Sequence, residues 1–222
     1  GTGSSGYRTY YGYRDAINFL GEYNFNLDNR IVYGLDNEFD AAKYPDGVNN
    51  KLYSDEAIYS QFLDYQFRPF EKLYATVGIR QDTHTTAGNE LTHRTTIAYK
   101  LNNNSKIRAS YGTGVRFPAL YDYFYGDVES NKEKLKAEEG ESFDIGYETF
   151  LDKFNLGLNV SLFKLKQTDP IVSQSRTRWL QMNAHATNES EGIEFSTNWK
   201  LNDIINIIFN YTFTDSFDSA SC

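Results

Sequence analysis

The chain of 222 residues contains no run of about 18 apolar residues, and its mean hydropathy is −0.61. A transmembrane helix needs such a run, so helical membrane spans are excluded. A membrane-spanning β-strand needs only about 10 residues with every second one apolar, which leaves the average hydropathy low. The missing apolar runs therefore exclude one kind of membrane protein and leave the other open.

Cysteine, proline and positive charge are scarce as well. The one cysteine, Cys222, ends the chain, so no internal disulfide can form and a disulfide scaffold is excluded. The chain has 4 prolines against 18 tyrosines and 16 phenylalanines, a composition that favours strands over helices. With 22 Lys and Arg against 30 Asp and Glu, the net charge of −8 offers no basic stripe for phosphates, which excludes nucleic acid as a partner.

Motifs for catalysis or metal binding are also absent. His84, His93 and His185 stand alone, without a histidine four residues away or a cysteine nearby, so we expect no metal site. No G-x-S-x-G elbow occurs, and we predict no enzyme activity. The opening letters GTGSSG match G-x-G-x-x-G, yet no strand precedes them and no amphipathic helix follows, so a phosphate-binding loop is rejected.

What the sequence does contain is strict alternation of apolar and polar residues, the pattern of a strand whose two faces differ. The alternation is clearest over 71–80, 154–162 and 204–213. Weaker alternation marks further strands near 13–25, 30–39, 55–67, 90–101, 105–113, 141–150 and 179–200. We therefore predict an all-β chain of about ten strands, arranged as an antiparallel meander.

The connections between the predicted strands alternate in length. Tight turns are expected at 26–29, 68–71, 102–105, 151–153 and 201–203, and longer loops at about 41–54, 84–89, 114–138 and 169–178. Short periplasmic turns at one end and long extracellular loops at the other are typical of a transmembrane β-barrel. A β-sandwich would mix its loop lengths between both ends.

The two faces of the predicted strands also favour a large barrel. Near the tight turns the apolar face carries an aromatic girdle, as expected at a membrane interface: Tyr65, Phe67, Tyr99, Tyr147, Phe154 and Trp199. The opposite face carries too many charges for a dry core: Asp36, Glu38, Arg80, Arg94, Lys100, Arg108, Asp144, Glu148, Glu194 and Lys200. A wide lumen, filled by water or by a plug, accommodates these charges.

Two stretches carry a more specific signal. SYGTGVRFPALYDYFYG (110–126) is followed by NKEKLKAEEGESFDIGYE (131–148), and QMNAHATNESEGIEFSTNW (181–199) precedes IIFNYTFTDS (207–216). Both resemble barrel motifs of TonB-dependent outer-membrane receptors, with the cobalamin and siderophore receptors nearest in character. Phe117 departs from the pattern, because the family usually has a small residue there. The matching positions are Val115, Arg116, Phe117, Pro118, Leu120, Tyr121, Asn131, Leu135, Glu138, Glu139, Gly146, Glu148, Asn183, Gly192, Ile193 and Glu194.

The resemblance implies a 22-stranded family barrel filled by an N-terminal plug, of which about ten strands would form a central part. We expect residues 1–222 to be a partial barrel domain without the plug and the closing strands, because GTGSSG and SFDSASC look like cuts within a longer protein. The implied location is the bacterial outer membrane. The implied partners are outer-membrane lipid, TonB acting through the missing plug region, and a small ligand such as a metal chelate or corrinoid.

The resemblance also assigns roles to individual residues. Aromatic rings in an extracellular loop give a large contact area at little entropic cost, which suits a bulky ligand. The candidate ligand-binding residues are Arg116, Tyr121, Tyr123, Phe124, Tyr125 and Trp179. Packing against the barrel rim stays the alternative for each ring, and a structural lumen role is favoured for Arg116. The structural family positions are Pro118, Leu120, Gly146, Glu148, Asn183, Gly192 and Glu194.

Two charged segments have plainer interpretations. Residues 35–40, with Asp46 and Asp55, could ligate calcium in an outward loop, but a solvated acidic loop is favoured. Residues 131–141 mix both signs of charge and are expected to be a solvated part of the long loop. We expect no other cofactor.

Three functions remain open at this point. The favoured hypothesis is uptake of a scarce, bulky ligand, such as a ferric siderophore or cobalamin, with energy delivered through TonB. A passive porin or structural barrel would need charge rings around an open constriction, and it would leave the Arg-x-Pro-x-Leu-Tyr stretch at 116–121 unexplained. A surface adhesion protein is the third, supported only by the aromatic loop.

Overall fold

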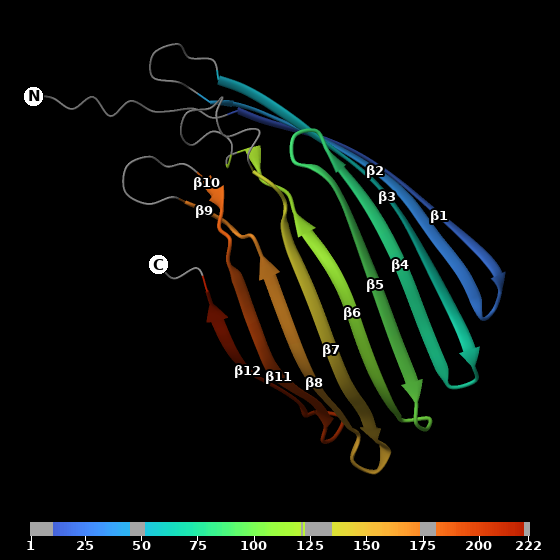
Figure 1. Ribbon diagram of the computed structural model, residues 1–222. Coiled ribbons are helices and arrows are strands. Elements are labelled where there is room, and N and C mark those ends of the chain that lie inside the picture. The colour runs from blue at the N-terminus through green and yellow to red at the C-terminus, as the bar shows by residue number, and fades with distance from the viewer. Residues whose placement is uncertain (1–10, 45–51, 121, 123–134, 174–180, 220–222) are drawn as a thin grey trace, which may run out of the picture.

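The computed structural model describes residues 11–44, 52–120, 122, 135–173 and 181–219. Ten of its strands form one antiparallel sheet in the order β1-β2-β3-β4-β5-β6-β7-β8-β11-β12, and β9 pairs with β10 in a separate ribbon (Figure 1). Within these residues no helix is long and apolar enough to cross a bilayer. The elements are β1 (Tyr11–Asn26), β2 (Asn29–Tyr44), β3 (Leu52–Phe70), β4 (Leu73–His84), β5 (Gly88–Lys100), β6 (Ser105–Arg116), β7 (Glu138–Leu151), the 3-10 helix η1 (Asp152–Phe154), β8 (Leu156–Thr168), β9 (Ile171–Ser173), β10 (Gln181–Asn183), β11 (Thr187–Lys200) and β12 (Asn206–Asp218).

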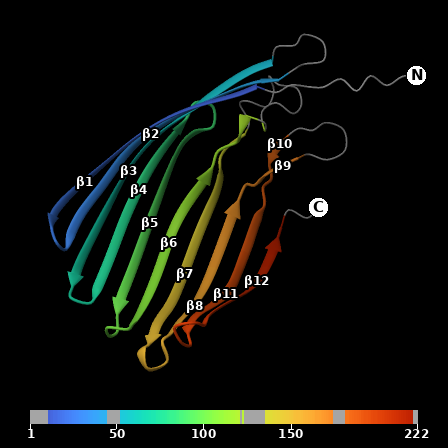
Figure 2. The ribbon, with the colours of Figure 1, turned by 180° about the vertical axis from the view of Figure 1, so that it is seen from behind.

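The predicted meander and its five tight turns are confirmed. The turns lie at one end of the sheet, and the start of β1, the end of β12 and the strand ends that lead into the longer connections lie at the other end (Figures 1 and 2). Backbone hydrogen bonds close the turns, as where Leu101 N–H donates to the Ser105 carbonyl over 2.9 Å between β5 and β6. We call the end with the tight turns periplasmic and the other end extracellular, following the usual asymmetry of outer-membrane barrels.

Two predicted boundaries are wrong. The β4–β5 connection, expected as a longer loop at 84–89, consists of Thr85, Thr86 and Ala87 alone, because the His84 ring nitrogen accepts the Thr86 and Ala87 N–H groups and closes it tightly. The strand expected over 179–200 is divided, because residues 181–183 pair with β9 in the separate ribbon and the chain joins the main sheet only at Thr187, where β11 begins.

The segment expected to be solvated at 131–141 is also different where the structure describes it. Leu135, Ala137 and Glu138 are 3%, 4% and 4% exposed, and β7 already begins at Glu138. Leu135 and Ala137 are apolar and alternate along the chain, and the Glu138 carboxylate has an arginine partner, so burying these three residues carries little cost. The mixed charge of the segment does not predict this burial.

Alternation places the apolar residues on one face of the sheet, the outer face, and the polar residues on the other, the lumen face. Cross-strand partners share a face, as Ile145 does with Ala109 and with Leu162. Large apolar side chains on the outer face remain accessible, with Leu162 51% and Phe209 52% exposed. In water this much apolar surface would be a liability, whereas a bilayer solvates it.

The outer face has a sharp upper border. Along each strand of the main sheet except β6, about four outer-face positions next to the periplasmic turn carry no charged, amide or imidazole side chain. The next outer-face position carries the first such side chain. These border residues are Asp15, Asn37, Gln61, Gln81, His93, Glu141, Lys164, Glu191 and Asp215. Between Leu156 and Lys164 the rise is about 26 Å along the strand, or about 20 Å of depth at the usual tilt, which is close to the height of a barrel's apolar band.

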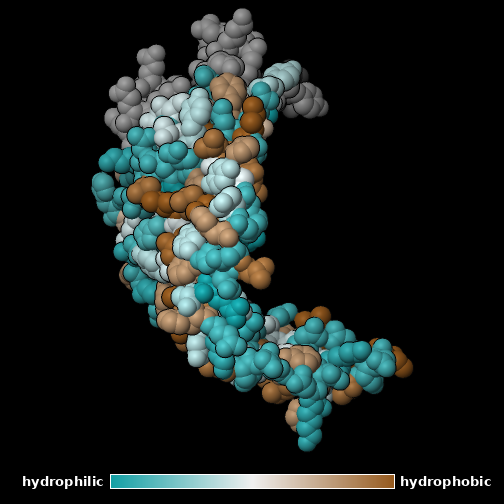
Figure 3. Space-filling model, turned by 90° about the vertical axis from the view of Figure 1, so that its right-hand side faces the viewer, coloured by the Kyte–Doolittle hydropathy of each residue, from teal (hydrophilic) through white to brown (hydrophobic). Residues whose placement is uncertain are grey.

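The sheet is strongly curved and does not close on itself. Its edges are β1 and β12, which lie at opposite sides of the molecule (Figure 1), and its curved profile is visible from the β1 side (Figure 3). The lumen face is more crowded, with Asp64, Asp82 and Ser161 only 8%, 5% and 3% exposed, as expected for the hollow side of a curved sheet. Ten strands that leave their edges apart belong to a barrel of more than ten strands.

Candidate functional site

The candidate site is the lumen face, and its wall is built from paired charges. Near the extracellular half, Arg80 of β4 donates to Asp36 of β2 over 3.0 Å and to Asp82 over 2.9 Å. Ser60 adds a hydrogen bond of 2.5 Å to the same Asp82 carboxylate. These contacts cross three strands, so the partly buried charges of Asp36, Arg80 and Asp82 lie against opposite charges.

Lower on the wall the same arrangement recurs. Arg94 of β5 pairs with Asp64 of β3 across the intervening strand, where Gly78 lies beneath the pair. A Cβ at Gly78 would collide with the Asp64 carboxylate, so the glycine makes room for the ion pair. Arg108 of β6 bonds Asp144 over 2.7 Å and Glu148 over 3.0 Å, both on β7.

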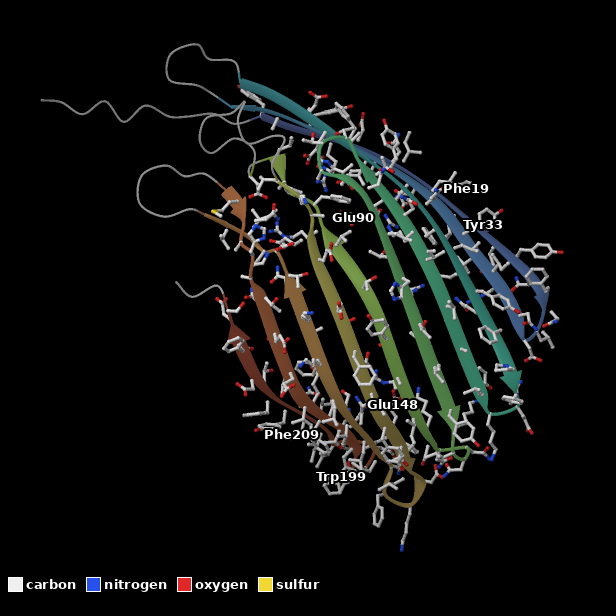
Figure 4. All side chains as sticks on the ribbon, in the orientation of Figure 1. Phe19, Tyr33, Glu90, Glu148, Trp199 and Phe209 are labelled. Carbon is white, nitrogen blue, oxygen red and sulfur yellow. The ribbon has the colours of Figure 1, made fainter. Side chains whose placement is uncertain are left out.

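Figure 4 labels side chains of both faces. By the strand register, Glu90 and Glu148 belong to the lumen face, whereas Phe19, Trp199 and Phe209 belong to the outer face. The predicted girdle is present near the turns: Tyr65 and Phe67 stack at 4.9 Å, and the Trp199 indole N–H donates to the Phe154 carbonyl over 3.0 Å. The charged residues that were predicted to face inward therefore form the wall of the lumen. The predicted aromatic girdle lies on the opposite, outer face.

Several hollows lie along the lumen face, and two of them differ clearly in their lining. The first, of about 290 Å³, has a polar floor that includes Asn18, Asp36 and Arg80, and an apolar roof of Val115 and Phe117. The second, of about 530 Å³, lies nearer the periplasmic turns and is lined by polar residues such as Asn159 and Ser196. Because Val115 and Phe117 line the 290 Å³ hollow together with residues of β1 to β4, the extracellular end of β6 folds over the lumen face of those strands.

At that folded end, Arg116 and Glu138 form a bidentate ion pair of 2.6 and 2.5 Å. The Glu138 carboxylate also accepts the Ile171 N–H over 2.6 Å and the Gln167 amide over 2.9 Å. Glu138 lies above the apolar band. Burial alone would raise its pKa, but Arg116 and these hydrogen-bond donors hold the pKa below its usual value, so the Glu138 carboxylate is ionised. Arg116 therefore has a structural partner, while its side chain stays 54% exposed.

Phe117 and Pro118 anchor the start of the β6–β7 connection. Pro118 is fully buried, and Phe117 stacks on the buried His84 imidazole with ring centroids 5.0 Å apart. His84 Nδ1 accepts the N–H groups of Thr86 and Ala87, so the proton lies on Nε2, which faces the Glu56 carboxylate at 3.2 Å. The sequence does not predict this role of His84, because Glu56 and Phe117 lie far from it along the chain.

The other motif positions also have structural roles. Glu148 pairs with Lys106 as well as with Arg108, and Glu194 accepts a 3.4 Å hydrogen bond from Ser161. Gly146 lies against the Arg108 guanidinium, and a Cβ at Gly192 would clash with the Phe213 carbonyl and with the Phe163 ring. Leu120 is partly buried two residues after Pro118.

Asn183 makes the most specific contacts of the motif set. Its side-chain oxygen accepts the Lys136 N–H over 2.8 Å, and its amide nitrogen donates to the Lys136 carbonyl over 3.0 Å and to the Asp169 carbonyl over 2.9 Å. One side chain thus bonds two connections that lie far apart in the sequence.

Five of the predicted ligand-contacting residues, Tyr121, Tyr123, Phe124, Tyr125 and Trp179, lie outside the described residues, as does Asp46 of the suggested calcium loop. In the part of the chain that is described, no group of three or more His, Cys, Asp or Glu is arranged to hold a metal ion. Asp36 and Asp40 of that acidic segment are instead bonded to arginines of the wall.

The curved sheet, its lipid-compatible outer face and its charged lumen face define a large outer-membrane β-barrel. Residues 1–221 match the family described as TonB dependent receptor-like, beta-barrel, and the chain belongs to this family. The family lies in the outer membrane of Gram-negative bacteria, so the predicted class and location are confirmed.

Comparison with individual proteins agrees with the family. The probable TonB-dependent siderophore receptor PiuA of Acinetobacter baumannii is 27% identical over 131 residues, which is 57% of this chain and 17% of that protein. The siderophore receptor PirA of Pseudomonas aeruginosa superposes with a TM-score of 0.78 at 17% identity, over 92% of this chain and 40% of PirA. The iron transporter FrpB of Neisseria meningitidis gives 0.78 at 14% identity, over 95% and 36%. These relatives are transport receptors, not enzymes.

Proposed function

We propose that this chain forms part of the wall of a receptor that takes up a ferric siderophore across the outer membrane, with energy supplied through TonB. The observation that carries the proposal is the family match over residues 1–221, combined with relatives whose names describe siderophore and iron uptake. The chain spans 36% to 40% of the solved receptors and 17% of PiuA, so we propose that it is the central part of a larger barrel with a plug.

The lumen wall supports transport of a bulky ligand. Ten curved strands with separated edges would line one side of a wide lumen, and wide lumens admit large solutes or a plug domain. Among the described residues the guanidinium groups of the wall are paired with carboxylates, as Arg80 is with Asp36 and Arg94 with Asp64. Such a wall lets a plug or ligand move past it without desolvating isolated charges.

A ferric siderophore fits the relatives better than cobalamin does. The names of PiuA and PirA describe siderophore receptors, and FrpB is an iron transporter. Ligand contacts by the rings of the two long extracellular connections belong to the same proposal, since aromatic side chains there would cover a bulky chelate.

The test is uptake by cells that carry the full-length gene, with and without TonB. Labelled ferric siderophores of several chemical classes and labelled cobalamin are offered in parallel. We expect uptake of one siderophore class that is lost without TonB. Entry of many small solutes that does not depend on TonB would replace the proposal with a passive pore, and TonB-dependent uptake of cobalamin alone would replace its ligand.

A further inference from the structure

The β6–β7 connection (117–137) and the β8–β11 connection (169–186) are the longest connections at the extracellular end. Long loops of barrels usually move independently, because each is held only by its own pair of strands. Here the β7–β8 ladder ends at the pair Glu139 and Thr168, and the β8–β11 ladder ends at Thr187 and Thr168. Beyond these pairs, toward the extracellular end, the sheet ladders no longer link the two connections. Any contact that holds them together must come from side chains or from backbone outside the sheet.

Glu138 supplies the first joint. Its carboxylate is fixed by Arg116 at the end of β6, and the same two oxygens accept Gln167 of β8 and the backbone N–H of Ile171 in β9. The Ile171 bond is made to the backbone of the second connection, so it holds the path of that chain and not only a side chain. At 4% exposure, water does not compete for these bonds.

Asn183 makes the second link between the two connections, and its side-chain amide bonds the backbone as a residue of a neighbouring strand would. Its amide gives Lys136 both an acceptor and a donor, as a neighbouring strand residue would, and its second N–H reaches the Asp169 carbonyl. The last residue of β10 is thereby bonded to the first connection just before β7 and to the start of its own connection. Figures 1 and 2 both show the β9–β10 ribbon beside the extracellular ends of the neighbouring strands.

We infer that Glu138 and Asn183 are positioning residues that lock these two extracellular connections into one rigid body. The locked parts are the described ends, residues 117–120 and 135–137 on one side and 169–173 and 181–186 on the other. If the proposed uptake function holds, a ligand that contacts either connection orders both. The link between the two connections does not depend on the uptake function, because the hydrogen bonds of Glu138 and Asn183 form without a ligand.

The test measures the joint directly in the full-length receptor, free of other cysteines. Spin labels are attached at Ala119→Cys and His185→Cys, two exposed positions on the two connections, and the distance distribution between them is measured by double electron–electron resonance. We expect a narrow distribution that widens at least twofold in Asn183→Asp, which keeps the shape and removes both donors. Glu138→Gln, which weakens the ion pair with Arg116, should widen it as well.

Glu148→Gln is the matched control, since Glu148 is also paired with arginine but lies on the wall nearer the periplasmic turns. Heat-modifiable migration on gels selects folded barrels of every variant. Widths that do not change in either test variant, or that change equally in the control, overturn the inference. Because no ligand is present, this outcome is separate from a failure of the uptake assay, which would overturn only the function.

Discussion

Arginine placed on the outer face should destabilise the barrel according to depth, and β8 offers a matched series. Leu156 lies beside the periplasmic turn, and Val160 lies midway between it and the border residue Lys164. Four residues rise about 13 Å along a strand, or about 10 Å in depth at a tilt near 40°. Val160 is therefore close to the middle of an apolar band about 25 Å high.

The magnitudes follow from the cost of arginine at each depth. Val160→Arg should lower the free energy of unfolding by about 2–4 kcal/mol, and Leu156→Arg by about 0–1 kcal/mol. Asn159→Arg is the control, because this neighbouring residue faces the 530 Å³ hollow of the lumen, where a guanidinium remains hydrated. We expect its effect to stay below about 1 kcal/mol.

The assay is urea unfolding of the full-length receptor in phospholipid vesicles, followed by tryptophan fluorescence and by heat-modifiable migration. The decisive comparison is between adjacent residues on opposite faces. A loss for Asn159→Arg that equals or exceeds the loss for Val160→Arg would refute the assignment of the faces. Equal losses at Leu156 and Val160 would refute the placement of the band.

Three further predictions use the same unfolding assay. Gly192→Ala should cost about 1–3 kcal/mol, because its Cβ would lie 2.7 Å from the Phe163 ring, whereas Gly114→Ala, with no atom within 4 Å, should change stability by less than about 0.5 kcal/mol. Arg94→Met should cost about 1–3 kcal/mol by leaving the Asp64 carboxylate, 8% exposed, without its partner, and Arg94→Lys should restore part of this. Phe117→Ala should cost about 2 kcal/mol through loss of its ring stack, and Phe117→Tyr should cost less than half of that.

The sequence predicted the meander because alternation is a local signal that survives in every strand. Strict parity over 71–80 places Val77 and Ile79 on one face and Arg80 on the other, and the register of β3, β4 and β5 keeps them there. The pairing of wall charges, such as Arg94 with Asp64 of the next strand but one, could not be predicted, because it depends on which side chains reach across an intervening strand.

The errors share one cause, which is tertiary contact at the extracellular end. The residues expected to form a longer loop at 84–89 include two threonines and Gly88, yet the His84 ring nitrogen closes the β4–β5 connection within three residues. Likewise Leu135 and Ala137 lie in a highly charged segment, and Asn183, remote in sequence, bonds the intervening Lys136 and holds that segment against the β9–β10 ribbon. Neither contact leaves a periodic pattern to detect.

The unusual Phe117 and the short β4–β5 turn explain each other. A ring at this position needs a flat, buried surface, and the His84 imidazole provides one because the Thr86 and Ala87 N–H groups and Glu56 hold its orientation. A small residue at 117 would leave that imidazole uncovered beside a carboxylate, and water would then compete for both. The departure from the family pattern is therefore compensated within this chain, where β6 folds over the wall and begins the connection on which the ligand rings are proposed to lie.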